Sequence, residues 1–242
     1  MDEKTPPILA TRALTCSRVL DRAAPSRVRD LSLAFEEKTT TLIWGEEGCG
    51  KNLLLRLLGL METPDGGEVL LRGMSMGLLS EEARAVTRNE HFGFLFAAPF
   101  LLPSFSLLEN VAMPLFKISS VNTEQARRRT QTVLDFVGLG GHAHSAVDEL
   151  PLPDQHRASL ARALVNWPEI LLVENLDASL HGGEPQLFLE LFQRAAAEFG
   201  TTTIITAADA GLARFADRGI AMAEGRVVHD DRTIPADHGA KV

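Results

Sequence analysis

The chain has 242 residues, of which 45% are hydrophobic and 23% charged, which excludes wholesale disorder. Its formal net charge of −8 argues against non-specific nucleic-acid binding, so we expect no nucleic-acid partner. Two cysteines are too few for a disulfide framework, and no stretch approaches the ~20 apolar residues of a membrane-spanning helix.

The beginning of the sequence, MDEKTPPILATRA, has no basic segment followed by an apolar one, so it does not read as a secretion signal. We therefore expect a protein of a reducing, cytoplasmic compartment.

Strands are expected early and late in the chain, with helices between them. Ser80 is typical of a helix N-cap, and Pro185 of a first helical turn. After a loose end over 1–12, the expected strands are 13–20, 28–35, 39–44, 68–71, 92–96, 169–173, 202–206, 219–222 and 226–228. The expected helices are 53–60, 80–88, most of 104–140, 155–165 and 185–199, with a weakly ordered tail after Asp230.

This order of elements indicates an α/β fold in which a sheet carries an inserted helical subdomain. We expect a single domain over 1–242, with its core in about 13–96 and 164–230 and the helical subdomain in about 97–163.

A glycine-rich loop joins an expected strand to an apolar helix within residues 41–60, TLIWGEEGCGKNLLLRLLGL. The loop fits the phosphate-loop pattern G-x-x-x-x-G-K in the strand–loop–helix context that this motif requires. Its backbone N–H groups would form a nest for phosphate at a helix N-terminus, and its lysine would add charge at the outer phosphates. The alternative is a glycine-rich turn without a ligand. The expected cofactor-binding residues are Gly45, Glu46, Glu47, Gly48, Cys49, Gly50, Lys51, Asn52 and Leu53.

One position of the loop departs from the pattern. The residue after the lysine is normally Ser or Thr, whose hydroxyl binds Mg²⁺, and here it is Asn52. Mg²⁺ demands near-octahedral oxygen geometry, and an amide oxygen is bulkier and easily turned away. A Mg²⁺ site is therefore doubtful.

With the loop placed, residues 13–228 resemble the ATP-binding subunit of an ABC transporter, most closely the lipoprotein-release and macrolide-export type. The resemblance implies a P-loop NTPase (RecA-like) core with an antiparallel β-subdomain and the inserted helical subdomain. The segments that carry it, besides the loop, are 73–88, 92–94, 101–103, 108–115, 161–166 and 222–227.

Most working residues of the family are nevertheless replaced. The family stacks an aromatic ring on adenine, but Leu20–Ala23 holds no aromatic residue and the chain has no Tyr. Ala97 stands where the glutamine that senses Mg²⁺ and the γ-phosphate belongs. The signature Leu-Ser-Gly-Gly-Glu reads Leu150–Asp154, LPLPD, in which two prolines have no N–H to donate.

The segment after the strand 170–173 is altered as well. The family's Asp-Glu pair is Glu174-Asn175 here, so a longer carboxylate replaces the aspartate and the general base is lost. The aspartate that helps to couple the two sites aligns with His181, and the switch histidine aligns with Ala208.

This pattern, with scaffold residues kept and chemical ones replaced, is that of a pseudo-ATPase, because groups that act as a unit leave little activity once several are lost. We assign no catalytic residue and no metal ligand. ATP remains the expected cofactor, bound weakly or without Mg²⁺. The alternatives are a slow ATPase that uses Glu174, Asp177 or Asp209, and a scaffold or regulator without a membrane partner.

The resemblance also implies partners. These are the transmembrane subunit of a transporter and a second ATP-binding subunit, identical or homologous, at the inner face of the plasma membrane. The family's membrane partner docks between core and helical subdomain, and here Phe96–Phe105, FAAPFLLPSF, would line that surface. His142 and His144 are expected to be solvated rather than metal ligands. Arg127–Arg129 is expected to be a solvated helix face, or to meet anionic lipid headgroups if the subunit docks at a membrane.

Overall fold

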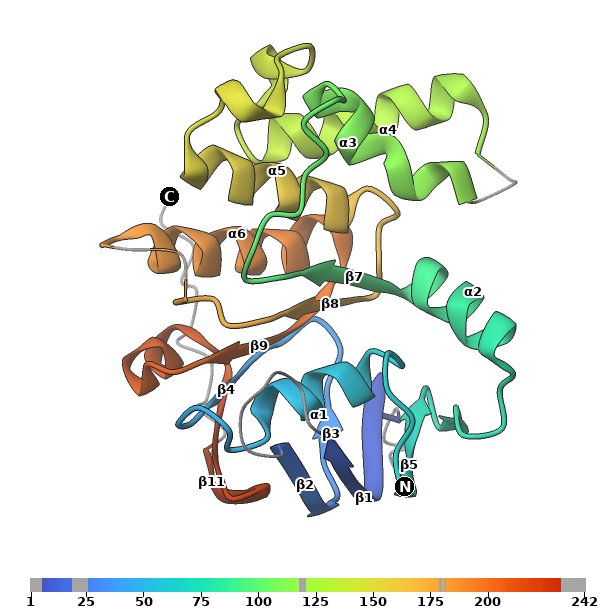
Figure 1. The fold of residues 1–242 in the computed structure, drawn as a ribbon, viewed down its shortest axis with the longest axis vertical. Coiled ribbons are helices and arrows are strands. Elements are labelled where there is room, and N and C mark those ends of the chain that lie inside the picture. Colours follow the sequence, from blue (N-terminus) through green and yellow to red (C-terminus); the bar gives the residue numbers. More distant parts are fainter. Residues whose placement is uncertain (1–5, 19–25, 118–120, 179, 181, 232–242) are drawn as a thin grey trace, which may run out of the picture.

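Two β-sheets organise the molecule (Figure 1). The computed structural model describes residues 6–18, 26–117, 121–178, 180 and 182–231, and the statements below refer to these residues. One sheet is mostly parallel and crosses the middle of the molecule. The other is antiparallel and lies at the end of the molecule where the chain begins.

The central sheet has six strands in the order β11-β10-β4-β9-β8-β7. Its pairs are parallel except for β10 with β11. Continuous apolar and β-branched runs such as 170–173, ILLV, form these strands because both faces of a parallel sheet are covered. The bounds are β4 Thr40–Trp44, β7 Phe92–Leu95, β8 Ile170–Val173, β9 Thr202–Ala207, β10 Arg218–Ala223 and β11 Arg226–Asp231.

The antiparallel sheet has the order β2-β1-β5-β6, with β3 also pairing with β1. The expected loose end over 1–12 is wrong from Leu9 onward, because Leu9 is fully buried and pairs with Leu71 and Phe35. The single strand expected over 28–35 is interrupted. The bounds are β1 Leu9–Arg18, β2 Ser26–Leu31, β3 Ala34–Phe35, β5 Gly66–Leu71 and β6 Met74–Ser75.

Helices cover both faces of the central sheet, and α3, α4 and α5 pack together at one end of the molecule (Figure 1). The helix α5 begins three residues before the expected start, because Pro151 is its N-cap and Pro153 lies in its first turn, where no N–H is required. The α-helices are α1 Lys51–Leu58, α2 Glu81–His91, α3 Leu107–Ala112, α4 Thr123–Phe136, α5 Leu152–Leu164 and α6 Glu184–Phe199. The 3₁₀-helices are η1 Met113–Lys117, η2 Gly140–His142, η3 Val147–Glu149 and η4 Ala210–Phe215.

The central sheet separates two hydrophobic cores. On β8, Leu171 and Val173 face the core formed with α3 to α6, whereas Ile170 and Leu172 face the core formed with α1 and the antiparallel sheet. This alternation follows from the two-residue period of a strand. The sheet is therefore held on both sides, and the loops at its carboxyl edge start from fixed positions.

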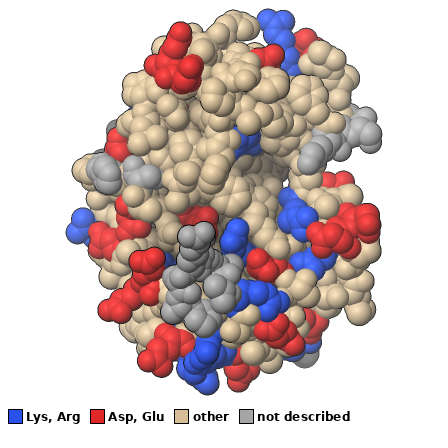
Figure 2. Space-filling model, viewed as in Figure 1, with Lys and Arg blue, Asp and Glu red and all other residues tan. Residues whose placement is uncertain are grey.

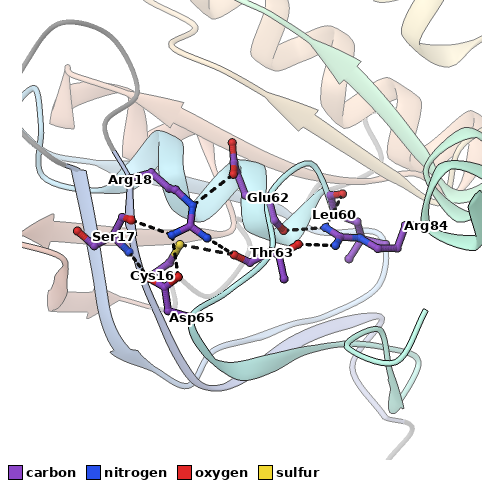
Figure 3. Close-up of polar contacts among 8 residues, drawn as sticks. All are labelled: Cys16, Ser17, Arg18, Leu60, Glu62, Thr63, Asp65 and Arg84. Atoms are coloured by element: carbon purple, nitrogen blue, oxygen red, sulfur yellow. Dashed lines mark hydrogen bonds and ion pairs between the residues drawn. The ribbon is translucent and has the colours of Figure 1, made fainter. Parts of the chain in front are cut away.

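A polar network fastens α2 and the antiparallel sheet to the end of α1 (Figure 3). Arg18 donates to Asp65 Oδ1 at 2.7 Å and to the carbonyl of Thr63 at 2.7 Å. Arg84 donates to the hydroxyl of Thr63 at 2.6 Å and to the carbonyl of Leu60 at 3.1 Å. Cations at the carboxyl end of a helix are favoured by its dipole, so this network stabilises the end of α1.

The expected architecture is confirmed: an α/β core with a mostly parallel sheet, an antiparallel β-subdomain and a helical subdomain. A helix cap expected from the sequence is also confirmed. Ser80, expected as an N-cap, accepts a hydrogen bond from the N–H of Ala83. In the structure Asn122 also caps a helix, α4, and accepts a hydrogen bond from the N–H of Gln125.

Candidate functional site

The glycine-rich loop connects β4 to α1 and is enclosed by neighbouring backbone. Gly50 has φ +102°, and a Cβ placed on it would lie 2.0 Å from the carbonyl oxygen of Arg27. A Cβ on Gly45 would lie 2.3 Å from the carbonyl oxygen of Met222. Both positions therefore require glycine for close approach of backbone. Gly50 is also the N-cap of α1, and no side chain bonds to the first N–H groups of that helix.

Lys51 is the first residue of α1 and is only 6% exposed. Its ammonium group donates to the carbonyls of Gly45 at 2.9 Å and Glu46 at 3.2 Å. The lysine thus closes the loop on itself and places its charge inside the curl. A helix N-terminus with open N–H groups and an adjacent cation is an arrangement suited to phosphate. Contact between the nine loop residues and a nucleotide stays a prediction.

Asn52 turns toward the end of β9. Its Oδ1 accepts a hydrogen bond from the hydroxyl of Thr206 at 3.0 Å. The same hydroxyl oxygen accepts the backbone N–H of Asn175 at 2.9 Å. The residue after the lysine is therefore linked through Thr206 to the segment after β8. Oδ1 of Asn52 is the atom that would have to replace a magnesium-binding hydroxyl. This atom is already engaged in the contact with Thr206.

The two aspartates considered as substitute bases hold backbone. The carboxylate of Asp177 accepts the N–H groups of Ala208 at 2.9 Å and Asp209 at 2.7 Å. Asp209 in turn accepts the N–H of Gly211 at 2.7 Å and caps η4. Both carboxylates therefore bind backbone N–H groups of the segment after β9.

The altered signature segment begins a helix in a different way from a serine cap. Pro151 is the N-cap of α5 and makes no side-chain hydrogen bond there. Leu152 follows it, with half of its surface exposed. The carboxylate of Asp154 pairs with Arg157 on the next turn, at 3.0 Å. The start of α5 therefore presents an apolar side chain and no hydroxyl.

Three sequence expectations lie outside the described residues, wholly or almost so. These are the missing adenine-stacking ring at Leu20–Ala23, the replaced coupling aspartate at His181 and the weakly ordered tail after Asp230. The other replaced positions are described. Ala97 follows β7, and Ala208 is an exposed residue directly after β9.

A groove of about 930 Å³ lies away from the phosphate loop, between α2, β7 and α5. The rings of Phe94 and Phe96 lie in its wall and stack with centroids 6.1 Å apart. Phe100 meets Phe96 edge-on at 6.0 Å and is 67% exposed. Part of Phe96–Phe105 is thus open to solvent next to a groove lined partly by aromatic rings.

The groove also contains a guanidinium group held by backbone. Arg162 donates to the carbonyl of Phe100 at 2.7 Å and to that of Pro99 at 2.8 Å. Burial lowers the pKa of Arg162 from its ordinary value. In the view of Figure 2, charged side chains gather over the antiparallel sheet and α2, whereas the upper part of the surface, over α3, α4 and α5, is largely uncharged.

Comparison with known proteins identifies the family. A family model described as "ABC transporter" matches residues 28–176, more than half of the chain. The chain belongs to the ABC transporter family. An ABC relative, the lipoprotein-releasing system ATP-binding protein LolD of Bacteroides fragilis, is 33% identical over 201 residues, which are 83% of this chain and 93% of that one.

Other ABC proteins are similar as well. The macrolide export ATP-binding/permease protein MacB of Sodalis glossinidius is 32% identical over 95% of this chain, which corresponds to 35% of that protein. The dimeric structure of MJ0796, a bacterial ABC transporter cassette, superposes with a TM-score of 0.82 over 94% of this chain and all of that one, at 24% identity. This last likeness concerns the ABC fold alone. No helix within the described ranges is long and apolar enough to span a bilayer.

Thr206 is a site residue that the sequence pattern does not predict. Its hydroxyl joins the loop to the end of β8, although it reads as one of several threonines in a buried strand. A signal was present, because Thr206 is at the carboxyl end of a central strand, where functional residues of α/β folds gather.

Proposed function

We propose that this ABC chain is a catalytically degenerate ATP-binding subunit, which supports a membrane transporter by docking and by structural or regulatory nucleotide binding. Efficient ATP hydrolysis is not part of this proposal. The proposal extends the family assignment and rests on the chemistry of the groups around the loop.

One observation carries the proposal: the two aspartates that follow β8 and β9, Asp177 and Asp209, are occupied by backbone N–H groups. Asp177 holds the N–H groups of Ala208 and Asp209, and Asp209 holds that of Gly211. Asn175, at the family's general-base position, bears an amide that does not take up a proton at neutral pH. Asn52 is bonded to Thr206, which favours nucleotide binding without Mg²⁺.

ATP titration of the purified protein, with Mg²⁺ and with EDTA, tests the nucleotide part. We expect saturable binding that is nearly independent of Mg²⁺ and is lost in Lys51→Ala. Phosphate release should stay at the level of the Lys51→Ala variant. Mg²⁺-dependent phosphate release that Lys51→Ala abolishes would instead support a slow ATPase, in which Glu174 or an aspartate takes an unusual role.

Absence of binding at millimolar ATP would mean that the loop is a structural remnant. The protein would then act by docking alone, and the nucleotide part of the proposal would be wrong.

The proposed docking surface is the groove together with the exposed part of Phe96–Phe105. Aromatic side chains are accessible to solvent both in the groove and on the exposed part of Phe96–Phe105. Exposed apolar patches of this kind mark interaction sites, which supports docking here. Co-purification with the cognate membrane subunit tests it. Phe100→Glu should abolish co-purification, whereas the control Val228→Glu, which alters an exposed apolar residue on β11, should retain it.

Retention by both variants would exclude docking through Phe100. If the wild-type protein neither pellets nor co-purifies with membranes, a scaffold or regulator without a membrane partner is favoured. We further propose a single ABC unit with the subdomain bounds given above, at the inner face of the membrane, paired with itself or with a homologous ATP-binding subunit.

A further inference from the structure

A small cavity, separate from the phosphate loop and from the docking groove, lies between α5 and the segment after β8. Its volume is about 10 Å³. Leu180 and Phe188 supply apolar wall, while His156, Glu174 and Asn175 supply polar groups. A cavity of this size accommodates about one water molecule if enough polar partners surround it.

His156 is the unusual member of this lining. It lies on α5 and is only 3% exposed. Its buried Nε2 atom has no hydrogen-bond partner among the described residues. Buried polar atoms are nearly always bonded to protein or to ordered water, because an unbonded one costs roughly 1–3 kcal/mol. Because His156 lines the cavity beside two other polar residues, its unbonded Nε2 points to a ligand there.

Burial of His156 favours a neutral ring, against the effect of nearby acidic groups. Burial lowers its pKa, and Glu184 at the start of α6 opposes this effect. Glu174 is the other charged group that lines the cavity, and on α5 itself Asp154 is paired with Arg157. Neutral imidazole presents one donor and one acceptor nitrogen, and water complements either.

Asn175 provides the second polar partner. Its side-chain amide makes no hydrogen bond with any residue that the structure describes, although its backbone N–H is bonded to Thr206. An amide group both donates and accepts, so it suits the same water molecule as a neutral imidazole.

We propose that this cavity binds one ordered water molecule, which hydrogen-bonds to Nε2 of His156 and to the side-chain amide of Asn175. The water ties α5, the helix that starts at the altered signature segment, to the end of β8. Since the backbone of Asn175 is already joined to Asn52 through Thr206, the polar chain then runs from the phosphate loop to α5. His156 acts as a positioning residue in this chain. The inference does not depend on ATP binding.

A double-mutant cycle in urea unfolding tests the link. His156→Leu and Asn175→Ala should each raise the unfolding equilibrium constant. In the double variant, the fold-increase of the unfolding equilibrium constant should be smaller than the product of the two single fold-increases, by a factor of about three or more. The reason is that either change alone already removes the bridge. In the control pair, His144→Leu with Asn175→Ala, the two effects on the unfolding equilibrium constant should multiply, since His144 is exposed on a different segment. Multiplicative behaviour of the His156 pair would overturn the proposal.

The sign of the single change is also decisive. If the cavity is dry, His156→Leu removes an unpaired nitrogen and should make the protein more stable. His156→Gln keeps a polar group that can reach the water, so it should restore most of the stability lost in His156→Leu. A more stable His156→Leu variant, or a Gln variant no better than Leu, contradicts the proposal.

A crystal structure that resolves buried waters gives the direct measurement. We expect one density peak within about 3.2 Å of both Nε2 of His156 and the amide of Asn175. The peak should be absent in His156→Leu. An empty or collapsed cavity in the wild-type protein would overturn the assignment.

Discussion

Gly50 and Gly48 both have positive φ, yet only one of them lies against backbone. A Cβ on Gly50 would meet the carbonyl of Arg27 at 2.0 Å, whereas one on Gly48 would meet nothing within 4 Å. We expect Gly50→Ala to lower the free energy of unfolding by about 2–4 kcal/mol, since it adds a clash with backbone to an unfavourable conformation. Gly48→Ala should cost about 1 kcal/mol, from conformation alone. Urea unfolding of both variants measures the difference, and equal losses would contradict this account.

Asn52 decides whether the loop can use Mg²⁺. In Asn52→Ser a hydroxyl replaces the amide, and we expect the ratio of ATP affinity with Mg²⁺ to that in EDTA to rise about tenfold over wild type, equal to about 1.4 kcal/mol. Parallel ATP titrations measure the ratio. Thr206→Val is the control, because it removes the partner of Asn52 without supplying a hydroxyl at position 52. If both variants gain the same magnesium dependence, the identity of residue 52 is not its cause.

At the scale of elements, Arg84 attaches α2 to the end of α1. Its side chain is 13% exposed and donates to the hydroxyl of Thr63 and to the carbonyls of Leu60 and Glu62. We expect Arg84→Ala to lower the free energy of unfolding by about 1–3 kcal/mol, because three oxygens lose a charged donor. Arg128→Ala is the matched control: Arg128 is 77% exposed, and its ion pair with Glu124 on the same helix should contribute at most about 0.5 kcal/mol.

Thermal or urea unfolding of the two arginine variants separates these contributions. A loss in Arg84→Ala no larger than that in Arg128→Ala would mean that α2 is held by its apolar contacts rather than by this network.

The positions of most elements could be predicted because their signals are local. Ser80 and Asn122 cap helices through their own side chains, and the run 170–173 is apolar throughout. The strand β1 was misplaced because Leu9–Arg12 is ordered by pairing with β5, more than fifty residues away. The start of α5 was missed because its prolines suggest a loop, although proline is tolerated in a first helical turn.

At the scale of the whole molecule, the sequence located the phosphate loop but not the contacts that join it to other strands. The motif around Lys51 is contiguous, so its pattern is sufficient to find it. The bond between Asn52 and Thr206 spans 154 positions, and the pairing of Asp177 with the segment after β9 spans 31. Such contacts arise only when the carboxyl ends of β4, β8 and β9 meet at one edge of the sheet.

The pH dependence of stability is a property of the whole chain, and His156 and Asp65 should each add a step to it in a different pH range. Burial lowers the pKa of His156 in the folded chain. In the unfolded chain the same ring binds a proton near its ordinary pKa of 6.5, where the folded chain does not yet bind one. Stability should therefore fall as pH drops below about 6.5. Hydrogen bonds from Arg18 and from the Ser17 N–H lower the pKa of Asp65 below its ordinary 3.8, so its stabilising contribution is lost only in stronger acid.

Urea midpoints between pH 8 and pH 3 measure both steps. His156→Gln should remove the first step alone, and the exposed-site control His144→Gln should keep it. Parallel profiles for wild type and His156→Gln between pH 7 and pH 5 would mean that the His156 ring titrates alike in the folded and unfolded chain.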